Sequence, residues 1–296
     1  MKQLQRWLLC LAIACALAPA ANAQKLIHSE RSLYREVLVY EDGPVRCMCF
    51  TRNCRIGRQT CMNMQAPNRF VMNYTKMMMA SLFMNPRPRS ILIIGLGGGT
   101  LPRALSQVLP GATIDVVEID PAVVKVAERF FAFHTSDKVR VETADGRVFV
   151  KRAQREQRQY DLVMLDAFDH EYIPEHLLTR EFLEEVSSLL SPQGVLAANT
   201  FSSSRLYDHE STTYAAVFGT FYNLKRDNRV ILAGKGGLPS KQQIAANAAG
   251  LERAFAPFDI DVSNYVAMFS TRPDWDPQAR ILTDQYSPAN LLNLRE

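Results

Sequence analysis

The stretch from Ser90 to Asp120 constrains the fold of this 296-residue chain more than any other. Ile91 to Gly95 is a continuous apolar run, typical of a strand buried in a parallel sheet. A turn with the sequence Gly95-Leu-Gly-Gly-Gly99 follows, then an expected helix over 101–109 and a strand over 112–118 that ends in a glutamate. Glycines let backbone N–H groups approach a ligand at a helix N-terminus. The pattern predicts a nucleoside-binding βαβ unit; a tight turn without a ligand is the alternative.

The residues around this turn indicate which nucleoside fits. A dinucleotide fingerprint has a small residue where this chain has Thr100, so nicotinamide cofactors are disfavoured. The carboxylate of Glu118 is placed to accept hydrogen bonds from a ribose, and the spacing suits a nucleoside without pyrophosphate, such as S-adenosylmethionine or its decarboxylated form. The candidate ligand-binding residues of this unit are Gly95, Gly97, Gly98, Gly99, Thr100 and Glu118.

The rest of the chain alternates strands and helices at a spacing typical of a parallel α/β sheet. Further strands are expected over 139–142, 160–165 and 195–201, with helices over 121–131, 147–157 and 179–190 and a turn over 192–194. The C-terminal part is expected to add a helix over 214–222, a strand over 229–233, a helix over 240–255 and a last strand over 265–270.

Short strand-like runs between positions 33 and 64 predict a small antiparallel β unit. A helix over 72–83 links this unit to the central strand, and the prolines that follow it end the helix. We therefore expect an N-terminal β unit with its linking helix over 24–85 and a Rossmann-like nucleoside-binding catalytic domain over 86–296.

Residues 1–23 read as a secretory signal peptide. Lys2 and Arg6 form a basic start, 7–18 is apolar, and Ala21-Asn-Ala23 is a small-x-small cleavage site. The apolar segment is too short to span a bilayer comfortably, so an uncleaved anchor is the lesser alternative, and a lipoprotein site at Cys15 is weaker still. We expect a periplasmic or secreted protein with no stable membrane insertion after cleavage.

Four cysteines remain after the signal peptide, and all lie close together: Cys47, Cys49, Cys54 and Cys61. In an oxidising compartment an even, clustered set predicts disulfides, with three pairings open. Cys49 and Cys54 are placed to face each other across a hairpin turn over 51–53. A zinc site and free structural thiols are the alternatives.

Acidic residues end successive strands of the predicted sheet, and the four are Glu118, Asp145, Asp166 and Asp169. Ligands of an open parallel sheet bind at the carboxyl ends of its strands, so these side chains are expected at one edge. Like charges packed together raise one another's pKa unless a cation is bound, and a sulfonium and an amine would provide the positive charge. Asp120 is expected to cap the following helix instead. With a formal net charge of +4 and scattered basic residues, the chain does not fit a nucleic-acid binder.

Several motifs in this order resemble the spermidine synthase family, in its divergent spermidine synthase-like branch. They are Ile91 to Gly99, Val117-Glu-Ile-Asp120, Ala144-Asp-Gly146, Asp166-Ala-Phe-Asp169 and Leu282-Thr-Asp-Gln-Tyr-Ser-Pro288. The resemblance covers nearly the whole mature chain and implies a methyltransferase-type Rossmann domain after a β-rich N-terminal unit. It also implies a dimer or tetramer, of which we expect the homodimer. We expect no permanently bound cofactor and no metal site.

The resemblance implies a role for each matching residue. Glu118 would hold the ribose, and Asp145 with Gly146 would hold the adenine amino group. Asp166 would be the catalytic base that takes a proton from the attacking amine, and Asp169 would anchor that amine. Gln59 matches a donor-contacting glutamine and Tyr74 a substrate-side tyrosine, which completes the list of candidate site residues.

Three positions depart from the family pattern. Thr100 stands where the synthases have an aspartate that binds the amine of the aminopropyl group, and Thr75 and Lys76 stand where they have His-Glu to grip the far end of a diamine. If Lys76 pointed inward, it would repel a second ammonium. The five histidines are scattered, and we assign none of them a catalytic or metal role: His28, His134, His170, His176 and His209.

Three functions are consistent with these residues. The first is transfer of an aminopropyl group from decarboxylated S-adenosylmethionine to a small-molecule amine, as in polyamine biosynthesis. The second is methylation of a small molecule by S-adenosylmethionine, which Thr100 favours. The third is a non-catalytic exported protein that binds polyamines or nucleosides, which the predicted export and the clustered cysteines favour.

Overall fold

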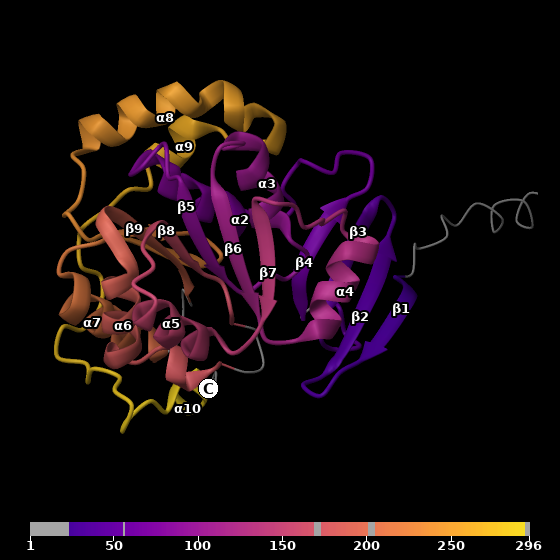
Figure 1. The fold of residues 1–296 in the computed structure, drawn as a ribbon, viewed down its shortest axis with the longest axis horizontal. Coiled ribbons are helices and arrows are strands. Elements are labelled where there is room, and N and C mark those ends of the chain that lie inside the picture. The colour runs from indigo at the N-terminus through magenta and orange to yellow at the C-terminus, as the bar shows by residue number, and fades with distance from the viewer. Residues whose placement is uncertain (1–23, 56, 169–172, 201–204, 294–296) are drawn as a thin grey trace, which may run out of the picture.

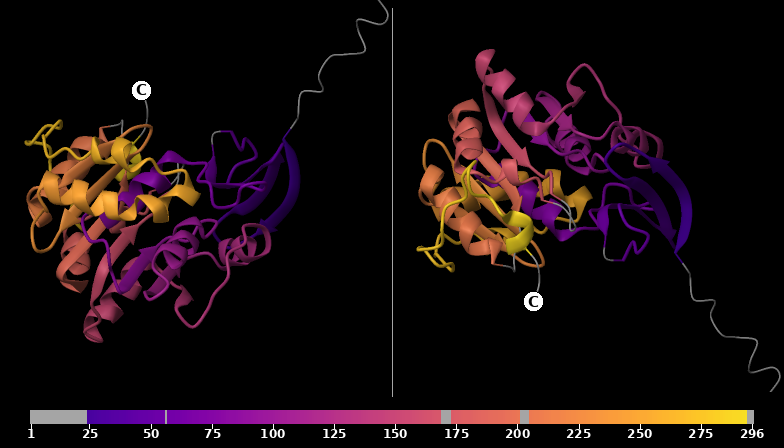
Figure 2. Two further views of the ribbon diagram at one scale, coloured as in Figure 1. Left: turned by 90° about the horizontal axis from the view of Figure 1, so that it is seen from above. Right: turned by 90° about the horizontal axis from the view of Figure 1, so that it is seen from below.

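The protein is described from a computed structural model that covers residues 24–55, 57–168, 173–200 and 205–293. Two sheets lie beside each other: a small one made by the N-terminal strands and a large one flanked by helices on both faces (Figures 1 and 2). None of the helices in these ranges combines the length and the apolar character needed to cross a bilayer.

The N-terminal sheet is antiparallel, in the order β1-β2-β3-β4. Its strands are β1 (Lys25–Arg31), β2 (Glu36–Asp42), β3 (Val45–Cys49) and β4 (Arg58–Asn63). The expected β unit is confirmed, but the expectation began only at position 33 and missed β1, an edge strand rich in polar and exposed residues. Val37, Val39 and Met48 form the apolar face of the sheet, which packs on one side of α4 (Pro121–Phe130).

The large sheet has the order β10-β11-β9-β8-β5-β6-β7. Five parallel strands form its body: β5 (Ser90–Ile94), β6 (Thr113–Glu118), β7 (Val139–Thr143), β8 (Tyr160–Leu165) and β9 (Leu190–Thr200). At one edge, β11 (Arg229–Gly234) pairs antiparallel with β9, and β10 (Tyr222–Lys225) pairs antiparallel with β11. This is the expected α/β fold with a mostly parallel sheet of the methyltransferase type.

Helices bury both faces of the large sheet. One layer contains α2 (Asn73–Met79), α3 (Thr100–Val108), α8 (Lys241–Phe255) and α9 (Val262–Val266); the other contains α5 (Gly146–Arg155), α6 (Arg180–Leu189) and α7 (Leu206–Phe218), while α10 (Ala289–Leu292) lies near the C-terminus (Figure 1). Along β5, Ile91 and Ile93 pack into the first layer, and Leu92 and Ile94 pack into the second. Both faces of this strand are therefore core, which explains its continuous apolar run.

Three sequence expectations for the later part of the chain were wrong. The helix over 214–222 is the second half of α7, which ends at Phe218 before Gly219 at φ +68°. The strand over 265–270 does not form: α9 occupies its start, and Ser270 makes only an isolated bridge to Asn223. The turn over 192–194 is an irregularity inside β9, since Tyr160 pairs with Leu190 but Leu162 already pairs with Val195.

The linking helix is shorter than expected. Over 72–83 the chain forms α2 and then a 3₁₀ turn, η2 (Ala80–Phe83), whose side chains are all buried. Further 3₁₀ turns are η3 (Glu175–Leu177) and η4 (Ala256–Phe258). Apolar spacing predicts burial here but does not separate an α turn from a 3₁₀ turn.

Candidate functional site

A cavity of about 1200 Å³ opens at the carboxyl ends of the parallel strands. The large sheet supplies one wall, with Gly95, Glu118, Asp145 and Asp166 among its residues. The N-terminal sheet supplies the opposite wall, which includes 33–35 and 58–59. Two distant parts of the chain therefore enclose the cavity, and its volume is large enough for a nucleoside and a second small molecule.

The glycine turn brings backbone directly against the end of β8. Gly95 has φ +100°, and a Cβ placed on it would lie 2.1 Å from the carbonyl oxygen of Asp166. The amide of Asp166 also donates to the carbonyl of Ile94 at 2.8 Å, so the two strand ends are held together. Only glycine fits at position 95, and its presence places the turn beside Asp166.

Glu118 ends β6 as a buried carboxylate. One oxygen accepts from the amide of Leu96 at 2.9 Å and the other accepts from the amide of Asp120 at 3.0 Å. Burial raises the pKa of Glu118 despite these donors. Each oxygen has further lone pairs for acceptance, and the residue lines the cavity, so the arrangement suits a pair of ribose hydroxyls.

Asp120 has a different role from Glu118. It accepts from the amide of Ala122 at 2.9 Å at the start of α4, so the expected helix cap is confirmed. Its second oxygen accepts from the hydroxyl of Ser32 at 2.6 Å. This bond joins the β1–β2 turn of the small sheet to the large one, beside the cavity that Asp120 lines.

Asp145 caps α5 and lines the cavity. One of its oxygens accepts from the amides of Arg147 and Val148, each at 2.9 Å, and the other lies 2.8 Å from Nε2 of His176. Burial by itself raises the pKa of Asp145, but the hydrogen bonds from Val148, His176 and Arg147 together lower it. Gly146 lines the cavity beside it. Sequence reasoning missed His176, because nothing in the sequence links a histidine on η3 to an aspartate 31 residues earlier.

Asp166 lies at the end of β8 and faces the cavity. Its carboxylate accepts from the Asn199 side-chain amide at 2.9 Å and from the Tyr74 hydroxyl. Burial nevertheless raises the pKa of Asp166 to about 7, and the charge of Glu118 adds to the effect. A carboxyl with this pKa exists in both protonation states near neutral pH, as a general base requires. Sequence reasoning missed Asn199, although its place at the end of β9 was a signal for it.

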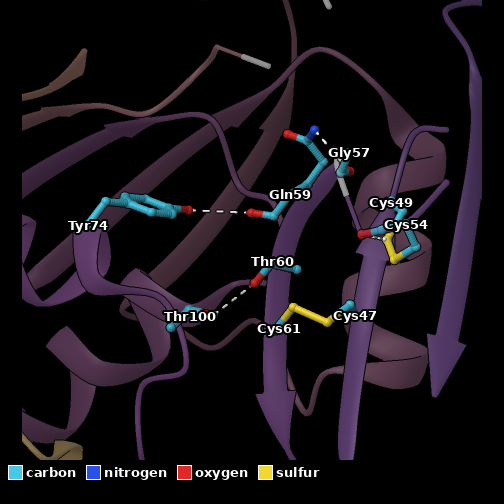
Figure 3. Close-up of a disulfide and its surroundings, with 9 residues drawn as sticks. All are labelled: Cys47, Cys49, Cys54, Gly57, Gln59, Thr60, Cys61, Tyr74 and Thr100. Carbon is cyan, nitrogen blue, oxygen red and sulfur yellow. Dashed lines mark hydrogen bonds between the residues drawn. A yellow bond between two sulfur atoms is a disulfide. The ribbon is translucent and has the colours of Figure 1, made fainter. Parts of the chain in front are cut away.

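The cysteines form two disulfides, Cys47–Cys61 and Cys49–Cys54. The expected pairing of Cys49 with Cys54 is confirmed, and the zinc and free-thiol alternatives were wrong. Cys47 and Cys61 face each other across β3 and β4. Figure 3 shows that Cys61 lies on the same strand as Gln59, which borders the cavity. The disulfides therefore brace the sheet that forms one wall of the site.

Gln59 and Tyr74, both predicted site residues, come together at this wall. The Tyr74 hydroxyl lies 3.5 Å from the carbonyl oxygen of Gln59, and both residues line the cavity (Figure 3). Thr100 instead places its hydroxyl 3.2 Å from that of Thr60 on β4 (Figure 3). Of the glycine turn, Gly95 and Gly97 line the cavity, whereas Gly98, Gly99 and Thr100 are not among its described lining residues. Position 100 thus contacts the small sheet.

The structure shows where the side chains of Lys76 and Thr75, two departures from the family pattern, are directed. Lys76 does not point into the cavity: its Nζ lies 2.9 Å from the carboxylate of Asp259, so the inward repulsion considered above does not arise. Thr75 is buried and donates to the carbonyl of Met72 at 2.6 Å. The predicted amine anchor Asp169 and its neighbour His170 lie outside the described residues.

Comparisons with known proteins agree with this geometry. The model of the spermine/spermidine synthase domain matches residues 71–223. A polyamine aminopropyltransferase of Vibrio vulnificus is 49% identical over 289 residues, which cover 95% of this chain and 96% of the relative. A human eEF1A lysine and N-terminal methyltransferase is 36% identical over 121 residues, but these cover only 38% of this chain and 17% of the relative.

One solved structure shows the same fold over most of the chain. A probable spermidine synthase from Corynebacterium glutamicum is 17% identical, with a TM-score of 0.63 and coverage of 86% of this chain and 98% of that one.

Proposed function

Because this chain belongs to the spermine/spermidine synthase family, we propose that it transfers an aminopropyl group from decarboxylated S-adenosylmethionine to a small amine. The observation that carries the proposal is the position of Asp166. This buried carboxyl with a raised pKa lies directly against the glycine turn that receives a nucleoside. A base beside a nucleoside is the arrangement that amine attack on a nucleoside sulfonium requires.

The nucleoside half of the cavity orients the donor. Glu118 accepts hydrogen bonds from the ribose hydroxyls, while Asp145 and Gly146 border the adenine. Both carboxylates are held by backbone N–H groups, so neither needs to reorganise when the donor binds. With the ribose and the adenine held in this way, the sulfonium of the donor lies near Gly95 and Gly97, next to Asp166.

Asp166 prepares the acceptor. It takes a proton from the acceptor ammonium, and the neutral nitrogen attacks the propyl carbon attached to sulfur. The new C–N bond forms as the C–S bond breaks, its electron pair stays on sulfur, and 5′-methylthioadenosine leaves. The proton lost by the nitrogen passes through Asp166 to water. Tyr74 and Asn199 hold the carboxylate in place, and in-line positioning supplies much of the rate.

Binding of three nucleosides tests the donor. We expect calorimetric titration to rank decarboxylated S-adenosylmethionine and 5′-methylthioadenosine above S-adenosylmethionine. A preference for S-adenosylmethionine would favour methyl transfer, for which the similarity to the human methyltransferase is the supporting observation. Absence of binding by all three would favour the non-catalytic alternative, which leaves the base and its two hydrogen-bond donors without a role.

We also propose that the protein is exported and acts outside the cytoplasm. The basic, apolar and small-residue pattern of residues 1–23 supports this, as do the two disulfides, since such bonds persist in oxidising compartments. Mass spectrometry of the protein from fractionated cells tests it. An N-terminus at Gln24 in the periplasmic fraction is the expected result; an intact Met1 in the cytoplasmic fraction would contradict it.

A further inference from the structure

Part of the cavity wall beside Asp145 is formed by residues 173–177, which follow β8 in the chain. Nε2 of His176 in this segment lies 2.8 Å from the Asp145 carboxylate. The segment contains only the short turn η3, so its position depends on the residues that bind it from other parts of the chain. Three of its residues line the cavity: Pro174, His176 and Leu177.

Asn290 of α10 binds this segment through both its side chain and its backbone. Its Oδ1 accepts from the amide of Ile173 at 2.9 Å, and its Nδ2 donates to the carbonyl oxygen of Ile173 at 3.0 Å. Nδ2 also donates to Oε1 of Glu175 at 3.0 Å, and the backbone amide of Asn290 donates to the same oxygen at 3.1 Å. The side-chain amide therefore uses its oxygen and both of its N–H groups on residues 173–175.

Other contacts hold the C-terminal segment against α5, the helix that Asp145 caps. Arg147 of α5 donates to the two carboxylate oxygens of Asp284 at 2.6 and 2.8 Å, and it donates to the carbonyl oxygen of His176 at 3.4 Å. Asn290 thus approaches residues 173–175 from a segment that is itself fixed. A buried apolar cluster joins the same parts of the chain: Ile173, Leu178, Leu206, Leu282 and Ala289.

We propose that Asn290 is a positioning residue for nucleoside binding, which acts by holding residues 173–177 so that His176 stays against Asp145. The assignment rests on the proposed function only in that the cavity receives a nucleoside. One oxygen of Asp145 already accepts from two backbone N–H groups, so an adenine amino group shares the other oxygen with His176. A shift of residues 173–177 therefore changes the acceptor that the nucleoside meets, while the base on β8 keeps its place.

The test measures 5′-methylthioadenosine binding by calorimetry in the variant Asn290→Asp. The carboxylate still accepts from the amide of Ile173, but its second oxygen replaces a donor and faces the carboxylate of Glu175. We expect Kd to rise about tenfold. Adding Glu175→Gln supplies an N–H donor to the introduced carboxylate, so the double variant should return to within about threefold of wild type. A variant that had only lost stability would not be rescued by this second change.

Kinetics with the same variants separate positioning from catalysis. At saturating amine, Asn290→Asp should raise KM for the donor about tenfold with kcat within about twofold, because the base and its partners are unchanged. Two exposed residues outside the cavity lining give matched controls, Asn53→Asp for the first substitution and Asp137→Asn for the second. Both controls should bind 5′-methylthioadenosine as wild type does.

The binding measurement also separates this assignment from the proposed function. Weaker binding by Asn290→Asp with recovery in the double variant supports the assignment even if no aminopropyl transfer is detected, in which case the proposed function alone fails. Equal affinities of wild type and Asn290→Asp, no recovery in the double variant, or no binding of 5′-methylthioadenosine by wild type overturns the assignment. A fall in kcat with an unchanged KM for the donor overturns it as well.

Discussion

Replacing Asp166 by asparagine should stabilise the folded chain at alkaline pH while it removes activity. Burial raises the pKa of Asp166 to about 7 from an ordinary 3.8, a difference of about three pH units. Each unit corresponds to about 1.4 kcal/mol of folding free energy, so keeping this carboxylate ionised costs the folded chain up to about 4 kcal/mol. Asparagine is neutral at every pH and avoids this cost.

The sign of the effect follows from proton binding. Between pH 3.8 and about 7 the folded chain binds more protons at Asp166 than the unfolded chain does, so the free energy of unfolding falls as pH rises. The stability that the protonated carboxyl provides is fully present below pH 3.8 and is lost as the pH rises through about 7. Integration gives a loss of about 2 kcal/mol between roughly pH 5.5 and pH 8.5, which the variant should not show.

Urea unfolding of wild type, Asp166→Asn and the control Asp137→Asn at these two pH values measures the effect. The gain of Asp166→Asn over wild type should increase by about 2 kcal/mol from the lower to the higher pH, whereas the control should show no such increase. The same variant should lose aminopropyl transfer by roughly 100-fold or more. A gain independent of pH, or lower stability of the variant at pH 8.5, would refute the reasoning.

Three further changes test other parts of the site. Glu118→Gln should weaken 5′-methylthioadenosine binding at least about tenfold in calorimetry. The side-chain NH₂ of glutamine cannot accept the hydrogen bond that one of the two carboxylate oxygens accepts from a backbone N–H group. Unchanged affinity would exclude ribose binding at this residue. Gly95→Ala should destabilise the chain by more than about 2 kcal/mol in urea unfolding, since its Cβ would meet a carbonyl oxygen at 2.1 Å, and a wild-type midpoint would contradict this geometry. Removing the Cys47–Cys61 disulfide by double alanine substitution should cost about 3 kcal/mol, given the 14-residue separation, with an unchanged unfolding midpoint as the contrary result.

The sequence was sufficient for the parts of the fold that local chemistry decides. The apolar run of β5, the glycine turn and the acid at the end of β6 lie within one short stretch of sequence, so their arrangement was predicted correctly from local pattern. The pairing of Cys49 with Cys54 was predicted because a hairpin turn separates them. By contrast, β1 is polar and exposed, and only its pairing with β2 makes it a strand.

Contacts between distant segments limited the prediction of the site. The direction of Lys76 depends on Asp259, which is 183 residues away in the sequence. His176 approaches Asp145 only because η3 packs beside α5, and Asn199 reaches Asp166 across neighbouring strands. The spacing of the motifs predicts at which strand end an acid lies, but the residues that shift its pKa are brought to it by the tertiary structure.

The central claim is that this cavity transfers an aminopropyl group with Asp166 as base. The direct measurement is mass spectrometry of the products after the purified chain is incubated with decarboxylated S-adenosylmethionine and 1,4-diaminobutane, with Asp166→Asn in parallel. We expect 5′-methylthioadenosine and an acceptor heavier by one aminopropyl group in equal amounts, with both nearly absent for the variant. Failure of wild type to form the aminopropylated acceptor, or equal yields from wild type and variant, would contradict the account.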